Sequence, residues 1–158
     1  SGEAAPGSLP GCEDAALIDP ELVTRKQVLI TEDLRRPEAL ARKSREEYLR
    51  SEIDEDLAER YLERMIGRMI DVNYHLLTES GEAPPRDYHE SFVALSRVGA
   101  LAADFARRLA PCAGLRNRIV HAYDDLDAGR VYDSLRDALA DVPAYLAGIR
   151  GFLDSHSA

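Results

Sequence analysis

A short stretch in the last third of the chain combines side chains that handle phosphate with one that moves protons. Arg116, Asn117, His121, Tyr123 and Asp124 lie within nine residues. Arginine is a permanent cation whose planar guanidinium matches phosphate oxygens, and histidine exchanges a proton near neutral pH. On a helix of about 100° per residue, Asn117 and Asp124 fall between Arg116 and His121, and Tyr123 falls about 20° from Arg116. The stretch therefore predicts a phosphate-handling helical surface with a tyrosine at its edge.

Composition limits the class of protein. The 158 residues suit one domain, and a hydrophobic fraction of 45% is ordinary for a globular chain. No apolar run approaches the roughly 20 residues of a membrane helix, and no signal peptide is evident, so we expect no membrane association. Cys12 and Cys112 lie in unlike contexts, which argues against a structural disulfide and favours a reducing cytoplasm.

Charge is spread unevenly along the chain. The formal net charge of −9 argues against a nucleic-acid binder that works through a bulk positive field. Basic residues nevertheless gather before and within the motif, where Asp104 stands against Arg97, Arg107, Arg108, Arg116 and Arg118. The cluster is compatible with a local positive patch on an acidic body or with an ordinary solvated helix face.

The elements that must position the motif are helical throughout. Residues 1–19 are expected to form a flexible leader, and residues 20–158 a helical domain. A first helix begins at Pro20 and continues past Pro37 only as a kinked piece to Leu40. A second runs from Ser51 to Glu79, with Ser51 and Asp54 resembling a capping box.

The second half of the chain supplies the remaining helices. One is expected over residues 87–98 and another from near Ala100 to Pro111. Pro111 and Gly114 interrupt the pattern, so residues 116–123 should start a fresh or bent piece. Asp127 is a suitable N-cap for the last helix. The sum predicts an all-α, antiparallel bundle of four or five main helices.

Two features of the expected second helix concern its charged residues: a row of arginines and a single aspartate. Arg60, Arg64 and Arg68 form a row four residues apart, which is typical of solvent-facing arginines paired with neighbours such as Glu59 and Glu63. Asp71 is either exposed to solvent or an anchor for an arginine such as Arg116.

The motif and two further segments resemble a known family. Arg116-x4-His121, with Asn117 after the arginine, is similar to the signature of the HEPN superfamily of helical bundles. Residues 114–123, followed by Asp127 and residues 131–132, resemble the HepT toxins of MntA/HepT toxin–antitoxin pairs. Residues 69–76 and 85–92 resemble the same family's second helix and its loop and third helix. The resemblance covers roughly residues 20–158, and it departs at Ala122, where glycine is more usual, and in the long leader.

The resemblance implies a metal-independent endoribonuclease that needs no cofactor. The 2′-hydroxyl of RNA attacks the adjacent phosphate, with tRNA or mRNA as substrate. Arg116 clamps phosphate oxygens, Asn117 orients a group at the site, and His121 acts as general base or acid. Asp71, Arg118 and Asp124 are supporting candidates. The four histidines, His75, His89, His121 and His156, share no zinc-like spacing.

The resemblance also implies partners. One histidine is few for acid–base cleavage, so we expect a homodimer with the site between protomers, and a higher assembly with an antitoxin is conceivable. In the family, an MntA-like nucleotidyltransferase antitoxin transfers AMP to the tyrosine that matches Tyr123. The added anion would occupy Arg116 and repel RNA.

Two other interpretations remain open from the sequence. The chain could be a non-catalytic HEPN module that binds a nucleotide or a nucleotidyltransferase partner. It could also be a plain bundle in which His121 is structural and Tyr123 only packs its ring.

Overall fold

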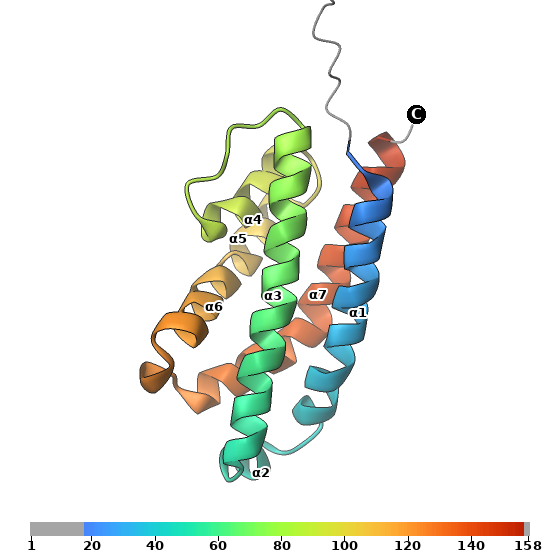
Figure 1. Cartoon of the computed structure of the whole chain (residues 1–158). Coiled ribbons are helices and arrows are strands. Elements are labelled where there is room, and N and C mark those ends of the chain that lie inside the picture. The colour runs from blue at the N-terminus through green and yellow to red at the C-terminus, as the bar shows by residue number, and fades with distance from the viewer. Residues whose placement is uncertain (1–17, 157–158) are drawn as a thin grey trace, which may run out of the picture.

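The computed structural model describes residues 18–156, apart from the side chain of Tyr123, and this part of the chain is all-α (Figure 1). Its elements are α1 (Pro20–Ala41), α2 (Arg45–Leu49), α3 (Glu52–Glu79), α4 (Tyr88–Arg97), α5 (Ala103–Leu109), α6 (Pro111–His121), the 3-10 turn η1 (Tyr123–Asp125) and α7 (Ala128–His156). In Figure 1, α1 and α6 run opposite to α3 and α7. The expected all-α bundle is thereby confirmed.

Side-chain caps set the starts of the long helices. Ser51, Asp87 and Asp127 accept hydrogen bonds from the backbone N–H groups of residues 54, 90 and 130. Ser51 and Asp127 were expected as caps from sequence, whereas Asp87 was placed inside its helix. Asp19, assigned to the leader from sequence, caps α1 by accepting from the N–H groups of residues 21 and 22. The remainder of the expected leader, residues 1–17, lies outside the described residues.

Three local expectations were wrong. Helix α1 is continuous through Pro37 to Ala41, with no separate piece after the proline. Pro111 separates α5 from α6 as expected, but it begins α6 itself and Gly114 lies inside that helix, so the fresh helix starts at residue 111 and not at 116. Proline is favoured at a first helical position because its missing N–H would have no intrahelical partner there. The preceding helix, α5, begins at Ala103 and not near Ala100.

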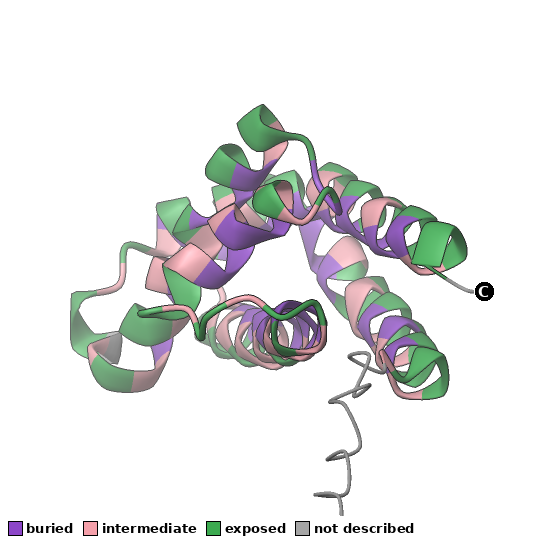
Figure 2. Cartoon of the chain, turned by 90° about the horizontal axis from the view of Figure 1, so that it is seen from above, coloured by how far each residue is buried: buried purple, intermediate pink, exposed green. Residues whose placement is uncertain are grey.

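Helix α3 is the centre of the packing. It contacts α1, α2, α4, α6 and α7. Viewed from above, the other helices lie in an arc around α3, and the buried surfaces face the interior between them (Figure 2). Fully buried side chains from α3, α4 and α7 fill the space: Leu62, Met65, Met69, Leu76, Leu77, Phe92, Leu95, Leu135 and Ile149. No helix within residues 18–156 has the length and apolar character needed to cross a membrane.

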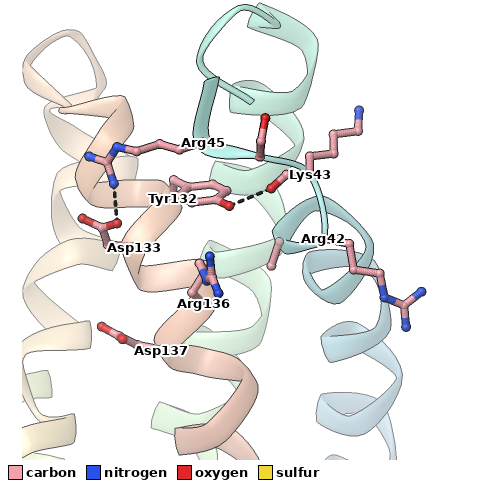
Figure 3. Close-up of a pocket in the computed structure, with 9 residues that line it drawn as sticks. Arg42, Lys43, Arg45, Tyr132, Asp133, Arg136 and Asp137 are labelled. Atoms are coloured by element: carbon pink, nitrogen blue, oxygen red, sulfur yellow. Dashed lines mark hydrogen bonds and ion pairs between the residues drawn. The ribbon is translucent and has the colours of Figure 1, made fainter. Parts of the chain in front are cut away.

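The five-residue helix α2 is held by contacts that sequence did not predict. The Tyr132 hydroxyl on α7 donates to the backbone carbonyl of Lys43 at 2.7 Å, and Arg45 pairs with Asp133 (Figure 3). The Lys43 ammonium lies 2.6 Å from the carboxylate of Asp54. The Ser51 N–H donates to the backbone carbonyl of Tyr48, so Asp54 does not complete a capping box with Ser51. A helix this short depends on such tertiary contacts, because its own hydrogen bonds cannot stabilise it.

A chain of buried polar groups joins α7, α3 and α4. The Tyr145 hydroxyl donates to Oδ1 of Asn73 at 2.6 Å, and Nδ2 of Asn73 donates to Oγ of Ser91 at 3.2 Å. The Ser91 hydroxyl then donates to the backbone carbonyl of Tyr88 at 2.6 Å. Because Tyr145, Asn73 and Ser91 are buried, each polar atom depends on its neighbour for a partner. This chain, called the Tyr145 network below, fixes α4 relative to the core.

We expect Tyr145→Phe to lower the free energy of unfolding by about 1–3 kcal/mol, since it leaves the buried Asn73 oxygen without its donor. Urea denaturation monitored by circular dichroism measures the change. Tyr61→Phe is the control, because the half-buried Tyr61 hydroxyl forms no hydrogen bond to the described residues. Equal losses in the two variants would contradict a stabilising role for the network.

Candidate active site

Arg116 lies half-buried on α6 and extends toward α3 and α4. Its guanidinium carbon lies 5.3 Å from the centre of the Tyr88 ring, within cation–π range. A Cβ atom on Gly67 of α3 would lie 3.9 Å from its Nε. That Nε is buried and has no hydrogen-bond partner among the described residues. Since buried N–H groups are seldom left unpaired, the position is suited to an oxygen ligand.

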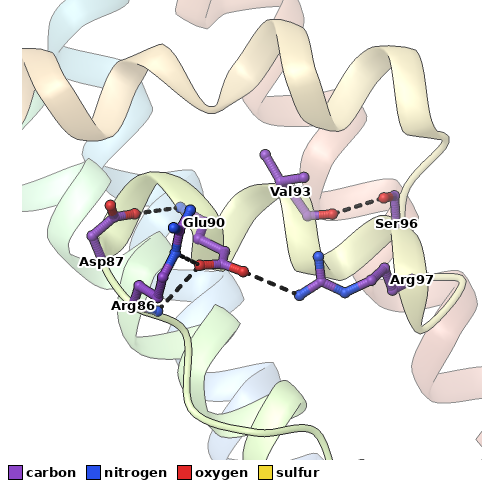
Figure 4. Close-up of polar contacts among 6 residues, drawn as sticks. All are labelled: Arg86, Asp87, Glu90, Val93, Ser96 and Arg97. Carbon is purple, nitrogen blue, oxygen red and sulfur yellow. Dashed lines mark hydrogen bonds and ion pairs between the residues drawn. The ribbon is translucent and has the colours of Figure 1, made fainter.

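Tyr88 is held in place by the start of α4. Asp87 caps the helix by accepting from the N–H of Glu90 at 2.8 Å, and Arg86 donates through Nε to the Glu90 carboxylate at 2.8 Å (Figure 4). Arg97 lies 3.5 Å from the same carboxylate. The Arg86 side-chain and backbone hydrogen bonds lower the pKa of Glu90 from its ordinary value, so the Glu90 carboxylate that holds Arg86 stays ionised. Tyr88 therefore presents its ring to Arg116 from a fixed helix end.

Arg116 borders a groove on the outer surface of α3. The groove has a volume of about 430 Å³. We call it the basic groove, and its lining residues are Lys26, Arg60, Glu63, Arg64, Gly67, Arg68, Asp71 and Arg116. Five of these side chains are cationic and two are carboxylates, which is a local excess of positive charge on a chain whose formal net charge is −9. The basic cluster named from sequence comprised Arg97, Arg107, Arg108, Arg116 and Arg118, and of these only Arg116 lines this groove.

Ion pairs across helices replace the pairings expected along α3. Arg68 lies 3.3 Å from Asp33 on α1, and Lys26 lies 3.5 Å from Asp71. Arg60 and Arg64 form no ion pair within residues 18–156, so the expected pairing with Glu59 and Glu63 was wrong. Asp71 is largely exposed and pairs with Lys26, so it does not anchor Arg116. The carboxylate and the guanidinium nevertheless line the same groove.

His121 lies apart from Arg116 on the same helix. It is the last residue of α6 and is exposed, and it makes no hydrogen bond with the rest of the described chain. Asn117 and Arg118 are also exposed. Arg118 lines a second hollow, on the side of α6 that faces α7. Within a single chain, Arg116 is half-buried and lines the basic groove, whereas His121 is exposed at the end of α6 and does not line that groove.

The helical arrangement does not extend to Tyr123 and Asp124. Ala122 has φ −140° and ψ 42°, which ends α6, and Tyr123 begins the 3-10 turn that contains the exposed Asp124. Placing these two residues on the same helical surface as Arg116 was therefore wrong. The side chain of Tyr123, the expected modification site, lies outside the described part of the structure.

Sequence reasoning missed two neighbours of Arg116. Tyr88 carries no signal of its role, although it lies in a segment that matched the resemblance. Lys26 comes from a helix 90 positions away from Arg116 in the chain, and only the packing of α1 on α3 brings it to the groove. The larger hollow, of about 960 Å³, lies between α7 and the α1–α2 connection, where basic and acidic side chains alternate (Figure 3). None of the motif residues lines it.

Solved structures with the same fold are found among toxin–antitoxin proteins. A tri-AMPylated HEPN toxin from Shewanella oneidensis, in complex with an MNT antitoxin, superposes with a TM-score of 0.76 at 20% identity, covering 84% of this chain and 99% of that one. A cytosolic protein of unknown function, YutE from Bacillus subtilis, gives a TM-score of 0.74 at 17% identity, covering 87% of this chain and 92% of that one. At these identities the likeness establishes the fold.

Sequence comparison establishes the family. A tRNA nuclease HepT from Aphanizomenon flos-aquae (strain 2012/KM1/D3) is 31% identical over 136 residues, which cover 86% of this chain and 92% of that protein. The HepT-like family, described as ribonuclease HepT-like, has a model that matches residues 30–149 of this chain. That range includes α3, the basic groove apart from Lys26, and the complete Arg116–Tyr123 segment. The chain therefore belongs to the HepT-like family of ribonucleases.

Proposed function

We propose that this protein is the toxin of a toxin–antitoxin pair, an endoribonuclease that cuts RNA without a metal ion and is silenced by AMP transfer to Tyr123. The observation that carries the proposal is the surroundings of the Arg116 side chain. Its guanidinium is positioned by Tyr88 and faces a basic groove, and its Nε lacks a partner in the described chain. A cation held in this way suits a phosphate whose negative charge grows during reaction. The related tRNA nuclease HepT supports RNA as the substrate.

The reaction uses a nucleophile that RNA already contains. The 2′-oxygen forms a bond to phosphorus while the bond from phosphorus to the 5′-oxygen breaks, which leaves a 2′,3′-cyclic phosphate and a 5′-hydroxyl. One histidine accepts the 2′-hydroxyl proton, and a second donates a proton to the departing 5′-oxygen. Arg116 binds the phosphate oxygens through charge-assisted hydrogen bonds, and Asn117 orients the histidine or a phosphate oxygen. The exposed Arg118 and Asp124 are supporting candidates.

A homodimer supplies what one chain lacks. Each protomer carries one motif histidine, exposed at the end of α6 and separated from Arg116. A two-fold axis near α6 would bring two copies of His121 to a shared cleft, one as base and the other as acid. We place the active form in the cytoplasm, where RNA and ATP are both present, with a nucleotidyltransferase antitoxin as its partner. The Shewanella oneidensis neighbour, an AMPylated toxin in complex with its antitoxin, supports that partner.

We expect His121→Ala to lower the cleavage of labelled tRNA or mRNA by about 100-fold or more, because proton transfer by a positioned group contributes roughly 10²–10⁴-fold. Denaturing gels in the presence of EDTA measure the rate, and mass spectrometry identifies the cyclic phosphate. His89→Ala is the matched control, since His89 is exposed on α4 and outside the motif. If parent and His121→Ala are equally inert while intact mass shows unmodified Tyr123, the protein is a non-catalytic module.

Loss of the Tyr88 ring should weaken catalysis without removing it. A cation–π contact contributes about 0.5–2 kcal/mol, so Tyr88→Leu should lower kcat/KM between roughly 2-fold and 30-fold. Tyr88→Phe retains the ring and should stay near the parental value. Steady-state cleavage of a short RNA measures both. Parental activity in Tyr88→Leu would mean that the ring does not position Arg116.

For the modification, we expect incubation with the antitoxin and ATP to add AMP to the parent and to abolish its cleavage of RNA. A nucleotide next to the motif adds an anion that competes with RNA phosphate for Arg116. Tyr123→Phe should gain no AMP by intact mass, whereas Tyr61→Phe, altered on α3, should be modified like the parent. Equal modification of Tyr123→Phe and parent would refute the assignment.

A further inference from the structure

We propose that the basic groove binds the phosphodiester backbone of a single RNA strand and leads it to Arg116. The identity of the ligand as RNA rests on the proposed function. The location of the site rests on the groove itself, which α1, α3 and α6 form together. It extends the phosphate-handling surface from the Arg116–His121 motif to residues of two other helices.

The groove contains cations that form no direct ion pair within residues 18–156. Arg60 and Arg64 are two of them, with Arg64 acting on the Asp33 carboxylate only through longer-range charge attraction, and the guanidinium of Arg116 lies over the Tyr88 ring. Arg60 is exposed and Arg64 is half-buried. Four residues of helix separate them, a rise of about 6 Å, which suits successive phosphates of an extended strand. Guanidinium groups can each bind one phosphate by a pair of hydrogen bonds.

The two remaining cations are held in place but stay accessible. Arg68 pairs with Asp33 at 3.3 Å, and Lys26 approaches Asp71 only to 3.5 Å. The Lys26 side chain is 32% exposed and that of Asp71 is 63% exposed, so water weakens this pair. Lys26 can therefore turn toward a phosphate at little cost. Both ion pairs also fasten α1 to α3, which keeps the two walls of the groove together.

Gly67 gives a strand room to approach the floor of the groove. It lies inside α3 between Arg64 and Arg68, where glycine disfavours the helix relative to alanine. A Cβ there would meet only Nε of Arg116 within 4 Å, at 3.9 Å, so packing does not require glycine. The missing side chain instead leaves the helix backbone open next to Arg116. A carboxylate introduced at this point would lie among the cations that hold the phosphates.

The favoured occupant is RNA because the unpaired cations follow the helix and end at Arg116, the residue that the proposed reaction uses. A strand that occupies the groove meets five cations and two carboxylates, Glu63 and Asp71, so positive charge predominates along its path to Arg116. An acidic segment of a second copy of this chain is the competing occupant. The experiment separates the two, since a protein contact changes assembly and a nucleic-acid contact changes the salt dependence of binding.

The test uses a fluorescent single-stranded oligonucleotide of 2′-O-methyl RNA, which has no attacking hydroxyl and stays intact on the full-length protein. Fluorescence anisotropy is measured over a series of salt concentrations. Arg60→Gln/Arg64→Gln should weaken binding and flatten the plot of log K against log salt by about 1.4, since each phosphate contact to a single strand contributes about 0.7. Arg107→Gln/Arg150→Gln removes the same charge from exposed positions on α5 and α7 and should leave the slope unchanged.

A second pair of variants isolates charge from volume. Gly67→Glu and Gly67→Gln have nearly the same shape, and the glutamate should bind the oligonucleotide at least about 10-fold more weakly, the factor that corresponds to about 1.4 kcal/mol. Circular dichroism verifies that both fold, and sedimentation compares their assembly with that of the parent.

Equal affinity and slope for parent and groove variants, in a protein that still cuts RNA, would overturn the groove and leave the nuclease assignment intact. Groove-dependent binding by a protein that cuts no RNA would support the groove and refute the nuclease. Changed assembly with unchanged binding would make this surface a contact between copies, against the proposal.

Discussion

The buried hydrogen bonds of the Tyr145 network are the constraint on which the positioning of this site depends. A polar side chain in an apolar core is stabilising only when its partners are in place. Tyr145, Asn73 and Ser91 satisfy one another in sequence, and the last of them donates to the carbonyl of Tyr88. Helix α4 is therefore locked to α3 and α7 at the residue whose ring contacts Arg116. The buried core is therefore connected through Tyr88 to the guanidinium of Arg116.

The remaining contacts of Arg116 follow from this arrangement. With Tyr88 fixed on one side and the bare backbone at Gly67 on the other, the guanidinium occupies the edge of a groove. Helix α1 closes that groove through Lys26, which pairs with Asp71, and Asp33, which pairs with Arg68. His121 has no comparable support, because it ends α6 in solvent. The chain thus holds Arg116 against Tyr88 and leaves His121 at the surface. In the proposed function, a second protomer encloses that histidine.

Local signals predicted most elements of the fold from sequence. Ser51 and Asp127 cap helices where their types indicate, and Gly81 and Gly99 adopt positive φ next to the ends of α3 and α4. The failures occurred where a residue has two possible roles. Pro111 can end one helix or begin the next, and Ala122 has no feature that announces the end of α6. Helix α2 is five residues long and depends on Tyr132 and Asp133, which are distant in sequence.

The sequence alone determined the all-α class, the family resemblance and the residues of the motif, because helix periodicity, caps and short motifs are written in neighbouring positions. It also displayed the row of arginines on α3. Only the tertiary structure decided that Lys26, Gly67 and Arg116 meet in one groove with that row, and that Asp71 pairs with Lys26. The physical reason is that periodicity indicates which side of a helix is apolar, whereas the helix packed against it depends on side-chain shape and buried polar pairing across the whole core.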